Sequence, residues 1–370
     1  MATMVDIAER ARVSLSTVSY VLSGKRPVSL DTRERVLQAI EELDYHPNAA
    51  ARALRGRRNR TLSLVMGPRD VDASADTIAG SMRVEIAEFM ATTVRLATER
   101  GYHVLLATAD SDGTDVRRMA GGSVADGFLL MSVRLQDARA QALKALGVPF
   151  GLIGHCANNE GIDFVDFDFE RAAESAVRHL AALGHRRIGF VNHAAAALKA
   201  GFGPAVRGQA GFQRTVAELG LEAAAEPSAA AVHAGIEAGR RLRRALPGMT
   251  AIVSINAEAT GGLMRGLRED GVRVPHDMSV VGVVTPFVAE LTTPALTTID
   301  FPAADMARMA TTQLIDRLEG LAGKAPVQAL LQGEVTVRGS TAEAGGRGGE
   351  SAAARDDTGG DAHVGTQHAP

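Results

Sequence analysis

Short hydroxyl side chains gather near the amino end of this 370-residue chain, in a stretch whose spacing suits contact with DNA. The residues concerned are Ser14, Leu15, Ser16, Thr17, Ser19 and Tyr20. A helix over residues 15–22 would place Leu15, Ser16, Ser19 and Tyr20 on its leading face, from which short side chains approach base edges in a major groove. Ser14 precedes that helix and fits the role of its amino-terminal cap. Thr17, Val18 and Val21 would face the preceding helix or a phosphate.

A run of arginines follows this stretch and could bind the DNA backbone. It consists of Arg52, Arg55, Arg57, Arg58 and Arg60, with no acidic residue between Tyr45 and Arg69. Residues 1–60 hold 11 Lys and Arg against 7 Asp and Glu, a net charge of +4, although the whole chain carries −3. Such a local excess predicts a phosphate-binding stripe, and the alternative is a solvated linker.

The first sixty residues read as four short helices that would position these groups. Thr3 and Asp6 are spaced to cap a first helix that runs to about Arg12, and a three-residue turn leads to the helix 15–22, closed by Gly24. Ser29 or Asp31 begins a third helix, and Pro47 forces the chain out of it, ahead of a fourth short segment over residues 48–54. Two helices joined by so tight a turn, with a third beside them, predict a helix-turn-helix unit.

From Thr61 the pattern changes to short apolar strands that alternate with helical stretches. Strands are predicted at 62–66, 104–108, 127–131, 150–153, 188–191, 251–255 and 279–283, and helices at 84–100, 138–146, 169–183, 208–219, 236–245 and 260–270. This alternation predicts a doubly wound α/β fold with parallel sheets, split into two lobes. Ligands of such folds bind in the cleft at the strand ends.

The composition indicates a chain that packs into several units. With 46% apolar residues, we expect a headpiece at 1–46, a hinge helix and basic linker at 47–60 and a two-lobed domain at 61–340. Residues 341–370 hold Val364 as their only large aliphatic side chain, which predicts a disordered tail. No signal peptide or membrane span is visible, so we expect a cytoplasmic protein. The single cysteine, Cys156, excludes an internal disulfide and fits a small buried apolar residue.

Several motifs together closely resemble the lactose/galactose repressor (LacI/GalR) family of bacterial transcription factors. In the headpiece they are Val5-Asp6-Ile7-Ala8, the stretch from Val13 to Ser19, Val28-Ser29, Thr32-Arg33, and Leu43-Asp44-Tyr45-His46-Pro47-Asn48. Further along they are Gly184-His185-Arg186-Arg187-Ile188-Gly189, Arg273-Val274-Pro275, Ser279-Val280-Val281-Gly282, and Pro294-Ala295-Leu296-Thr297-Thr298-Ile299. The resemblance covers about residues 3–340. It implies an all-α helix-turn-helix headpiece followed by a two-lobed, periplasmic-binding-protein-like effector domain.

The resemblance assigns DNA contacts residue by residue. It implies contacts from Thr3, Ser14, Leu15, Ser16, Thr17, Ser19, Tyr20, Ser29, Asn48, Ala51, Arg52, Leu54 and Arg55. Residues 48–54 match a hinge helix that folds when two subunits meet in the minor groove, since seven residues are too few to hold a helix alone. Leu54 matches the leucine that wedges between central base pairs. The alternative is that Leu54 packs on its own headpiece.

The ligand cleft departs from the family pattern. Asp168 aligns with an acidic family position, but Phe169 stands where asparagine is usual. Ala257 follows Asn256 where the family has aspartate, and Val283-Val284 replaces a Phe-Asp-Asp pattern. The candidate ligand residues are therefore Asp110, Asp168, Arg207 and Asn256, although an acid at a strand end often only caps a helix. These losses predict either an unusual ligand with few hydroxyl groups or the absence of any ligand.

Two other functions fit the fold less well. An enzyme such as a sugar kinase or dehydrogenase would need a phosphate-binding glycine motif, and Gly121-Gly122 is a bare pair without a nearby lysine. His185 has no nucleophile partner that can be placed. A transport-type binding protein would begin with a secretion signal. We therefore expect a homodimeric repressor of a palindromic operator, modulated by a sugar-like or related metabolite, with no catalytic residue, cofactor or metal.

Overall fold

A computed structural model describes residues 3–23, 26–43, 59–67 and 84–345. Its first part, the headpiece, consists of α1 (Met4–Ala11), α2 (Leu15–Ser23) and α3 (Leu30–Glu42). Thr3 and Asp6 cap α1 reciprocally, with the Thr3 amide donating to the Asp6 carboxylate at 2.6 Å. Arg12 ends this helix with a left-handed φ of 53°. The predicted helix-turn-helix unit is confirmed, whereas Gly24 and the expected helix at 48–54 lie outside the described residues.

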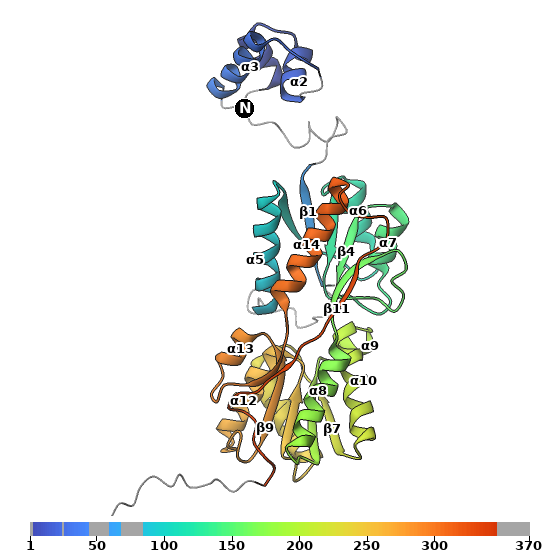
Figure 1. The fold of residues 1–370 in the computed structure, drawn as a ribbon, viewed down its shortest axis with the longest axis vertical. Coiled ribbons are helices and arrows are strands. Elements are labelled where there is room, and N and C mark those ends of the chain that lie inside the picture. The colour runs from blue at the N-terminus through green and yellow to red at the C-terminus, as the bar shows by residue number, and fades with distance from the viewer. Residues whose placement is uncertain (1–2, 24–25, 44–58, 68–83, 346–370) are drawn as a thin grey trace, which may run out of the picture.

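The N-lobe is built on a six-stranded parallel sheet with the order β11-β5-β4-β3-β1-β2. Its strands are β1 (Thr61–Met66), β2 (His103–Thr108), β3 (Gly127–Leu130), β4 (Phe150–Ile153), β5 (Asp163–Phe167) and β11 (Gln328–Leu331). Its helices are α5 (Val84–Glu99), α6 (Thr114–Gly121), α7 (Ala138–Leu146) and α14 (Ala303–Glu319). Figure 1 shows α5 and α14 side by side on this lobe, where they pack against each other.

The C-lobe repeats the architecture with the strand order β12-β10-β9-β8-β6-β7, in which only the short β12 is antiparallel to its neighbour among the described strands. Its strands are β6 (Arg187–Asn192), β7 (Glu222–Pro227), β8 (Ala251–Ser254), β9 (Ser279–Val284), β10 (Thr297–Asp300) and β12 (Val335–Thr336). All residues of β9 are buried, as expected for a parallel strand covered on both faces.

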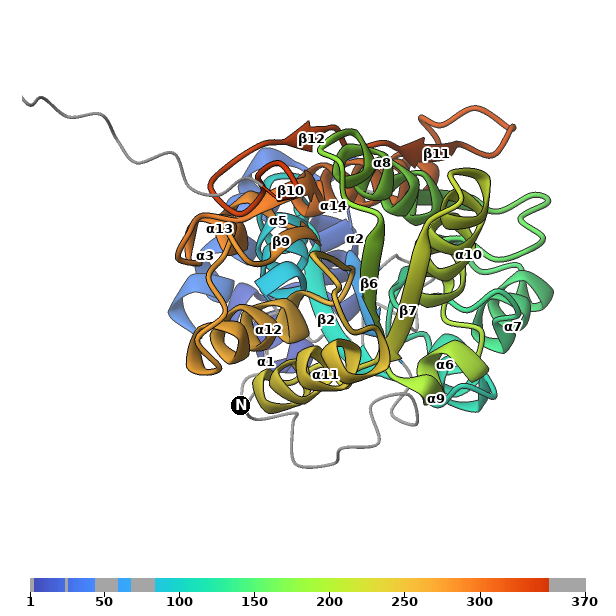
Figure 2. The same cartoon turned by 90° about the horizontal axis from the view of Figure 1, so that it is seen from below.

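Two pairs of helices cover the faces of the C-lobe sheet, as Figure 2 shows along its strands. One pair is α8 (Phe169–Ala182) with α10 (Gly203–Glu218), and the other is α11 (Val232–Ala245) with α12 (Ala257–Glu269). The short helices α9 (Ala195–Lys199) and α13 (Pro286–Glu290) complete the lobe. The chain passes between the lobes after β5, between β10 and α14, and between β11 and β12, so the predicted two-lobed α/β fold is confirmed.

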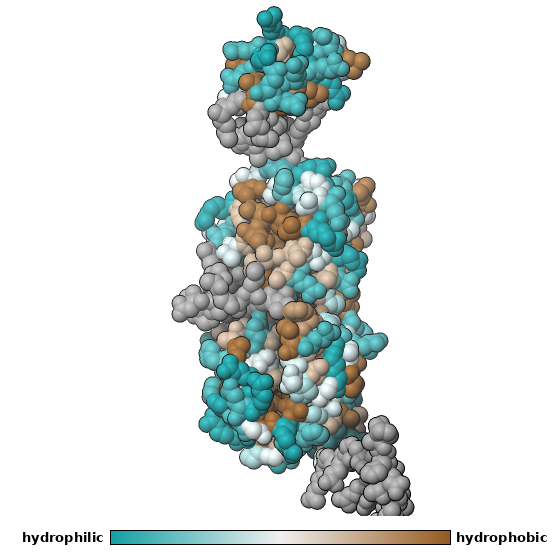
Figure 3. All heavy atoms as spheres, turned by 90° about the vertical axis from the view of Figure 1, so that its left-hand side faces the viewer, coloured by the Kyte–Doolittle hydropathy of each residue, from teal (hydrophilic) through white to brown (hydrophobic). Residues whose placement is uncertain are grey.

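One side of the molecule exposes apolar surface on both lobes. This is the side on which α5 and α13 lie in Figure 1, and Figure 3 views it directly. Val94 of α5 is exposed, as are Phe287 of α13 and Leu291 just after it, at 58% and 68% exposure. Large apolar side chains exposed together mark a surface that another molecule covers.

The prediction of a disordered tail over residues 341–370 is wrong for its first five residues. The structure packs residues 341–345 on the C-lobe, where the Ala342 amide donates to Ser279 Oγ at 3.1 Å and the Ala344 amide donates to the Leu183 carbonyl at 2.8 Å. Backbone hydrogen bonds hold this segment despite its poor apolar content. Residues 346–370 lie outside the described part of the chain.

Candidate nucleic-acid interface and interlobe cavity

The helix α2 presents the predicted short side chains on a free face. Leu15 is 48% exposed, Ser16 is exposed, and Ser19 and Tyr20 are partly exposed. On the opposite face Val18 is fully buried in a core with Ile7 and Val36. Packing of that core fixes how α2 projects from the headpiece, as a helix that reads a groove requires.

Hydroxyl groups cap the helices of the headpiece. Ser14 Oγ accepts a hydrogen bond from the Thr17 amide at 3.1 Å and lies 2.8 Å from Thr17 Oγ1. Ser29 caps α3 in the same way through the Thr32 amide. The capping role predicted for Ser14 is confirmed, while DNA contacts by these residues stay predictions. Asn48, Ala51, Arg52, Leu54 and Arg55 lie outside the described residues, so their assignments also stay predictions.

A cavity of about 120 Å³ lies between the lobes at the carboxyl ends of several strands. Its lining combines aromatic and aliphatic side chains with a few polar ones, and comprises Glu85, Ile86, Phe89, Met131, Ser132, Ile153, Asp166, Phe169, His193, Phe202, Ile255, Ala257, Glu258, Val283, Phe301 and Met306. Both the position and the composition are those of a small-molecule site in a doubly wound fold.

The predicted ligand residue Arg207 ties the lobes together. It belongs to α10 of the C-lobe, and its Nη2 donates to the carbonyls of His155 and Cys156 on the N-lobe side, at 3.0 and 3.4 Å. Its Nη1 lies 3.7 Å from the carboxylate of Asp166, which also pairs with His155 Nδ1 at 2.7 Å. Burial lowers the pKa of Arg207, and the charge of Asp166 opposes that effect. Arg207 therefore reaches the cavity through Asp166, which lines it.

Like Arg207 itself, the other three candidate ligand residues lie outside the lining. Asp168 caps α8 by accepting from the Arg171 amide at 2.9 Å, and Asn256 caps α12 through Ala259 while donating to the Ser228 carbonyl. Asp110 is exposed just after the edge strand β2. Helix capping is the alternative that the sequence left open for an acid at a strand end, and it accounts for Asp168. Ligand contact by these residues stays a prediction without support from the cavity.

A buried ion pair, which the sequence analysis missed, shapes the N-lobe wall of the cavity. Arg139 is fully buried and binds both carboxylate oxygens of Asp137, at 3.0 and 2.8 Å. It also donates to the carbonyls of Met66, Met131 and Ser132, at the ends of β1 and β3. Burial raises the pKa of Asp137, but the hydrogen bonds and charge of Arg139 outweigh it and the pKa lies below its ordinary value.

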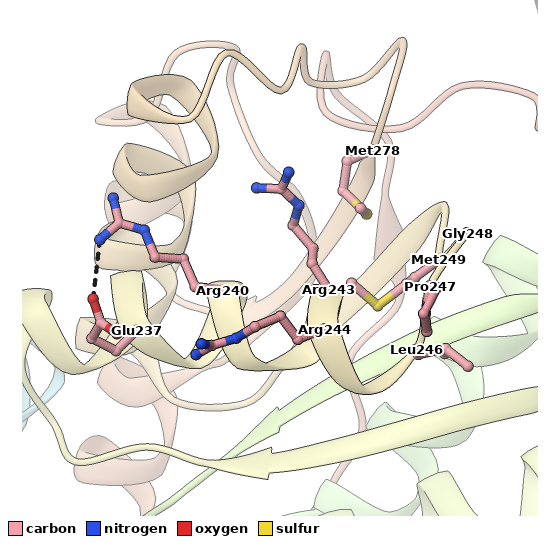
Figure 4. A pocket seen from close by; sticks show the side chains of 9 residues that line it. All are labelled: Glu237, Arg240, Arg243, Arg244, Leu246, Pro247, Gly248, Met249 and Met278. Carbon is pink, nitrogen blue, oxygen red and sulfur yellow. Dashed lines mark hydrogen bonds and ion pairs between the residues drawn. The ribbon is translucent and has the colours of Figure 1, made fainter.

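A larger hollow of about 680 Å³ lies on the outer surface of the C-lobe (Figure 4). Arg240, Arg243 and Arg244 of α11 project around it. Two of these cations bind carboxylates, because Arg240 pairs with Glu237 and Asp270 and Arg243 pairs with Asp270. The hollow also reaches Met249 and Met278, just before β8 and β9, so it lies at the amino ends of these strands. Ligands of this fold bind at the opposite end.

Cys156 and His185 are built into the packed interior. Burial, followed by the charge of Asp137, raises the pKa of Cys156 to about 11, so this thiol has little thiolate character. His185 is buried and bonds to Thr250 Oγ1 at 2.8 Å and to the Ala342 carbonyl at 3.0 Å. Within the described ranges, no helix is long and apolar enough to cross a membrane, and no three His, Cys, Asp or Glu side chains cluster as metal ligands.

Comparisons with known proteins agree with this architecture. Residues 3–48 match the family described as bacterial regulatory proteins, lacI family, and residues 177–341 match the periplasmic binding protein-like domain. The HTH-type transcriptional regulator MalR of Streptomyces coelicolor is 33% identical over 94% of this chain and 98% of its own. CelR of Thermobifida fusca is 31% identical over 91% of this chain and 98% of its own. This chain belongs to the LacI family.

Solved structures place the LacI-family chain in the same fold. A structure of a CelR–cellobiose complex aligns with a TM-score of 0.66 at 28% identity and covers 92% of this chain and all of the other. The lac repressor dimer bound to operator and an anti-inducer aligns with a TM-score of 0.76 at 24% identity, over 92% and 99% of the two chains. This LacI-family protein is a DNA-binding transcriptional regulator.

Proposed function

We propose that this LacI-family regulator is a repressor that binds a palindromic operator as a homodimer, in the cytoplasm. The exposed face of α2, held by a capped and packed headpiece, is the observation that carries the proposal, since one such headpiece reads one half-site. The relative PurR of Haemophilus influenzae, 29% identical over 86% of this chain, is named a transcriptional repressor. The relatives of this chain named above are regulators, and no catalytic role is proposed for it.

The exposed apolar side chains on α5 and α13 support the homodimer. Val94 of α5 and Phe287 of α13 are exposed, as is Leu291 just after α13, and the two helices lie on the same side of the molecule (Figure 1). A two-fold symmetric contact uses the same patch on both subunits, so a surface that runs along both lobes suits it. Dimerisation brings two headpieces to the two half-sites that a palindrome supplies.

We propose further that a small molecule bound between the lobes changes operator affinity. The cavity of about 120 Å³ takes residues from both lobes, including Asp166 from the N-lobe and Glu258 from the C-lobe. A ligand that contacts both lobes favours one angle between them, and this differential affinity is what couples two sites. Crystallised relatives include a CelR–cellobiose complex.

Selection from a randomised duplex pool with the full chain tests the operator proposal. The enriched sites should form an inverted repeat, and Phe287→Asp should lower both the dimer fraction in sedimentation equilibrium and the affinity for that repeat. Leu321→Asp is the matched control, because Leu321 is 69% exposed and lies beyond α14, away from α13. Enrichment of single half-sites, or a dimer that survives Phe287→Asp, would contradict the dimeric palindrome.

A further inference from the structure

Among the described residues, the polar side chains that line the interlobe cavity are mainly hydrogen-bond acceptors. Glu85, Asp166 and Glu258 contribute three carboxyl groups to the lining, and Ser132 and His193 add one hydroxyl and one imidazole. The described lining holds no lysine or arginine, because Arg207 lies behind Asp166 and binds backbone carbonyls. Ionised carboxylates only accept hydrogen bonds, whereas each sugar hydroxyl both donates and accepts. This inventory suits a ligand rich in N–H donors better than a polyol.

The carboxyl groups reach the cavity from both lobes. Glu85 lies in the first turn of α5 and Asp166 lies on β5, both in the N-lobe, while Glu258 lies in the first turn of α12 in the C-lobe. The Arg207 guanidinium offsets part of the charge of Asp166, but among the described residues the three carboxyl groups outnumber this one cation. A surplus of one charge sign in a cleft with apolar walls attracts an ion of the opposite sign. A cation between them would interact with both lobes at once.

Aromatic rings form much of the remaining wall. The ring centroid of Phe301 lies 5.8 Å from that of Phe169 and 6.1 Å from that of Phe89. On another part of the wall, the rings of His193 and Phe202 pack edge to face with their centroids 5.1 Å apart. Aromatic faces carry partial negative charge, so they attract cations as well as apolar groups. Phe169 and Val283 also line the cavity, and their side chains cannot form a hydrogen bond with a hydroxyl group of a ligand.

The volume limits the size of the occupant. The cavity measures about 120 Å³, and an apolar cavity of about 150 Å³ holds one benzene molecule. A group that fills this volume therefore has about the bulk of a single ring with a short substituent.

We propose that the effector of this regulator is a compact organic cation, with an ammonium or similar N–H-bearing cationic group among the carboxyl groups of Glu85, Asp166 and Glu258 and an apolar body against the phenylalanines. This inference rests on the proposed effector role of the cavity and names the chemical class of its ligand. The inference predicts which molecules bind in the cavity, and this binding can be measured without measuring operator affinity.

Isothermal titration of the full chain with three probes tests the class. Benzylamine is the cationic probe, benzyl alcohol is its neutral analogue of nearly equal size, and cellobiose represents the sugars. Benzylamine should bind at least about tenfold more tightly than benzyl alcohol, because only the cation gains from the carboxyl groups. Equal affinity for the two, no binding of benzylamine, or binding of cellobiose alone would overturn the proposal.

Charge-removing variants locate the site. Glu258→Gln keeps the side-chain size and should weaken benzylamine about tenfold while leaving benzyl alcohol unchanged. Glu237→Gln, in the outer hollow of the C-lobe, is the control and should change neither. An unchanged affinity for benzylamine in Glu258→Gln, with Glu85→Gln also without effect, would contradict a cation held in this cavity. Operator affinity measured separately on the same samples distinguishes loss of ligand binding from failure of the regulatory proposal.

Discussion

The guanidinium of Arg207 lies across the lobe junction from the carboxylate of Asp166, with 3.7 Å between Nη1 and Oδ2. The same guanidinium donates to two backbone carbonyls of the N-lobe, those of His155 and Cys156. Nearby, the Leu135 amide donates to the Gly201 carbonyl and the Gly203 amide donates to the Val133 carbonyl, at 2.8 and 3.1 Å. The two lobes are thus joined directly beside the cavity.

Replacement of Arg207 by methionine should destabilise the lobe junction. The change removes the donors to two partly buried carbonyls and a cation near Asp166, at a cost of about 1 to 3 kcal/mol in the free energy of unfolding. Urea denaturation of the full chain measures it. Arg214→Met is the control on the same helix, because Arg214 is half exposed and pairs only with Glu170 and Glu174 among the described residues. Exposed pairs contribute at most about 1 kcal/mol. Equal losses in the two variants would argue against a special role for Arg207.

Breaking the buried pair of Arg139 and Asp137 should have a larger effect. Arg139→Met leaves the Asp137 carboxylate buried without its cation, which costs about 3 to 5 kcal/mol. The double variant Asp137→Asn with Arg139→Met removes both charges and should recover part of this loss. Thermal and urea unfolding of the three proteins measure the difference. A double variant no more stable than Arg139→Met alone would show that the carbonyl contacts of Arg139, and not its charge pairing, dominate.

Truncation at two positions should separate the packed end of the chain from the residues that follow. Removal of residues 346–370 should leave stability almost unchanged, because this segment has few apolar side chains. Removal of residues 341–370 also deletes the Ala342 and Ala344 hydrogen bonds and uncovers His185. Each such bond contributes about 0.5 to 1.5 kcal/mol. Equal melting temperatures of the two truncated proteins would contradict the packing of residues 341–345.

Mild acid should weaken the C-lobe through His185. Burial lowers the pKa of His185 from its ordinary 6.5, an effect that its hydrogen bond to Ala342 only partly opposes. The folded state therefore favours the neutral ring, and its stabilisation is present above about pH 6.5 and is lost as the pH falls below that value. His185→Gln should be less stable at pH 8 but show a flatter decline between pH 7 and 5. Parallel slopes in urea unfolding would exclude His185 as the source.

Features governed by local sequence were predictable. The helix caps at Thr3, Ser14 and Ser29 and the helix Ala138–Leu146 match the prediction, because they depend on side chains within one turn and on regular apolar spacing. The helix α14 was missed although its buried residues recur at helical spacing. The buried residues of its first half are mostly small, namely Ala303, Ala307, Ala310 and Thr311, and the large ones except Met306 follow only from Leu314.

Features governed by tertiary contacts were not predictable. The edge strand β7 (Glu222–Pro227) has no β-branched residue and forms by pairing with β6. Burial of Arg139 depends on carbonyls at the ends of two strands that are distant in sequence. At the cleft, the sequence indicated Asp168 and Asn256, whereas the lining acids are Glu85, Asp166 and Glu258. Asp166 and Glu258 each lie two residues from a predicted residue, so only the folded geometry separates cap from lining.

Equilibrium binding of the full chain to a palindromic duplex obtained by selection tests the central claim most directly. The affinity should exceed that for a scrambled duplex of the same composition by about 10³-fold or more. It should also fall linearly with salt on logarithmic axes, since basic side chains displace counterions from phosphates. Equal affinity for the two duplexes, or an affinity for the palindrome that does not change with salt, would contradict a regulator that reads DNA through α2.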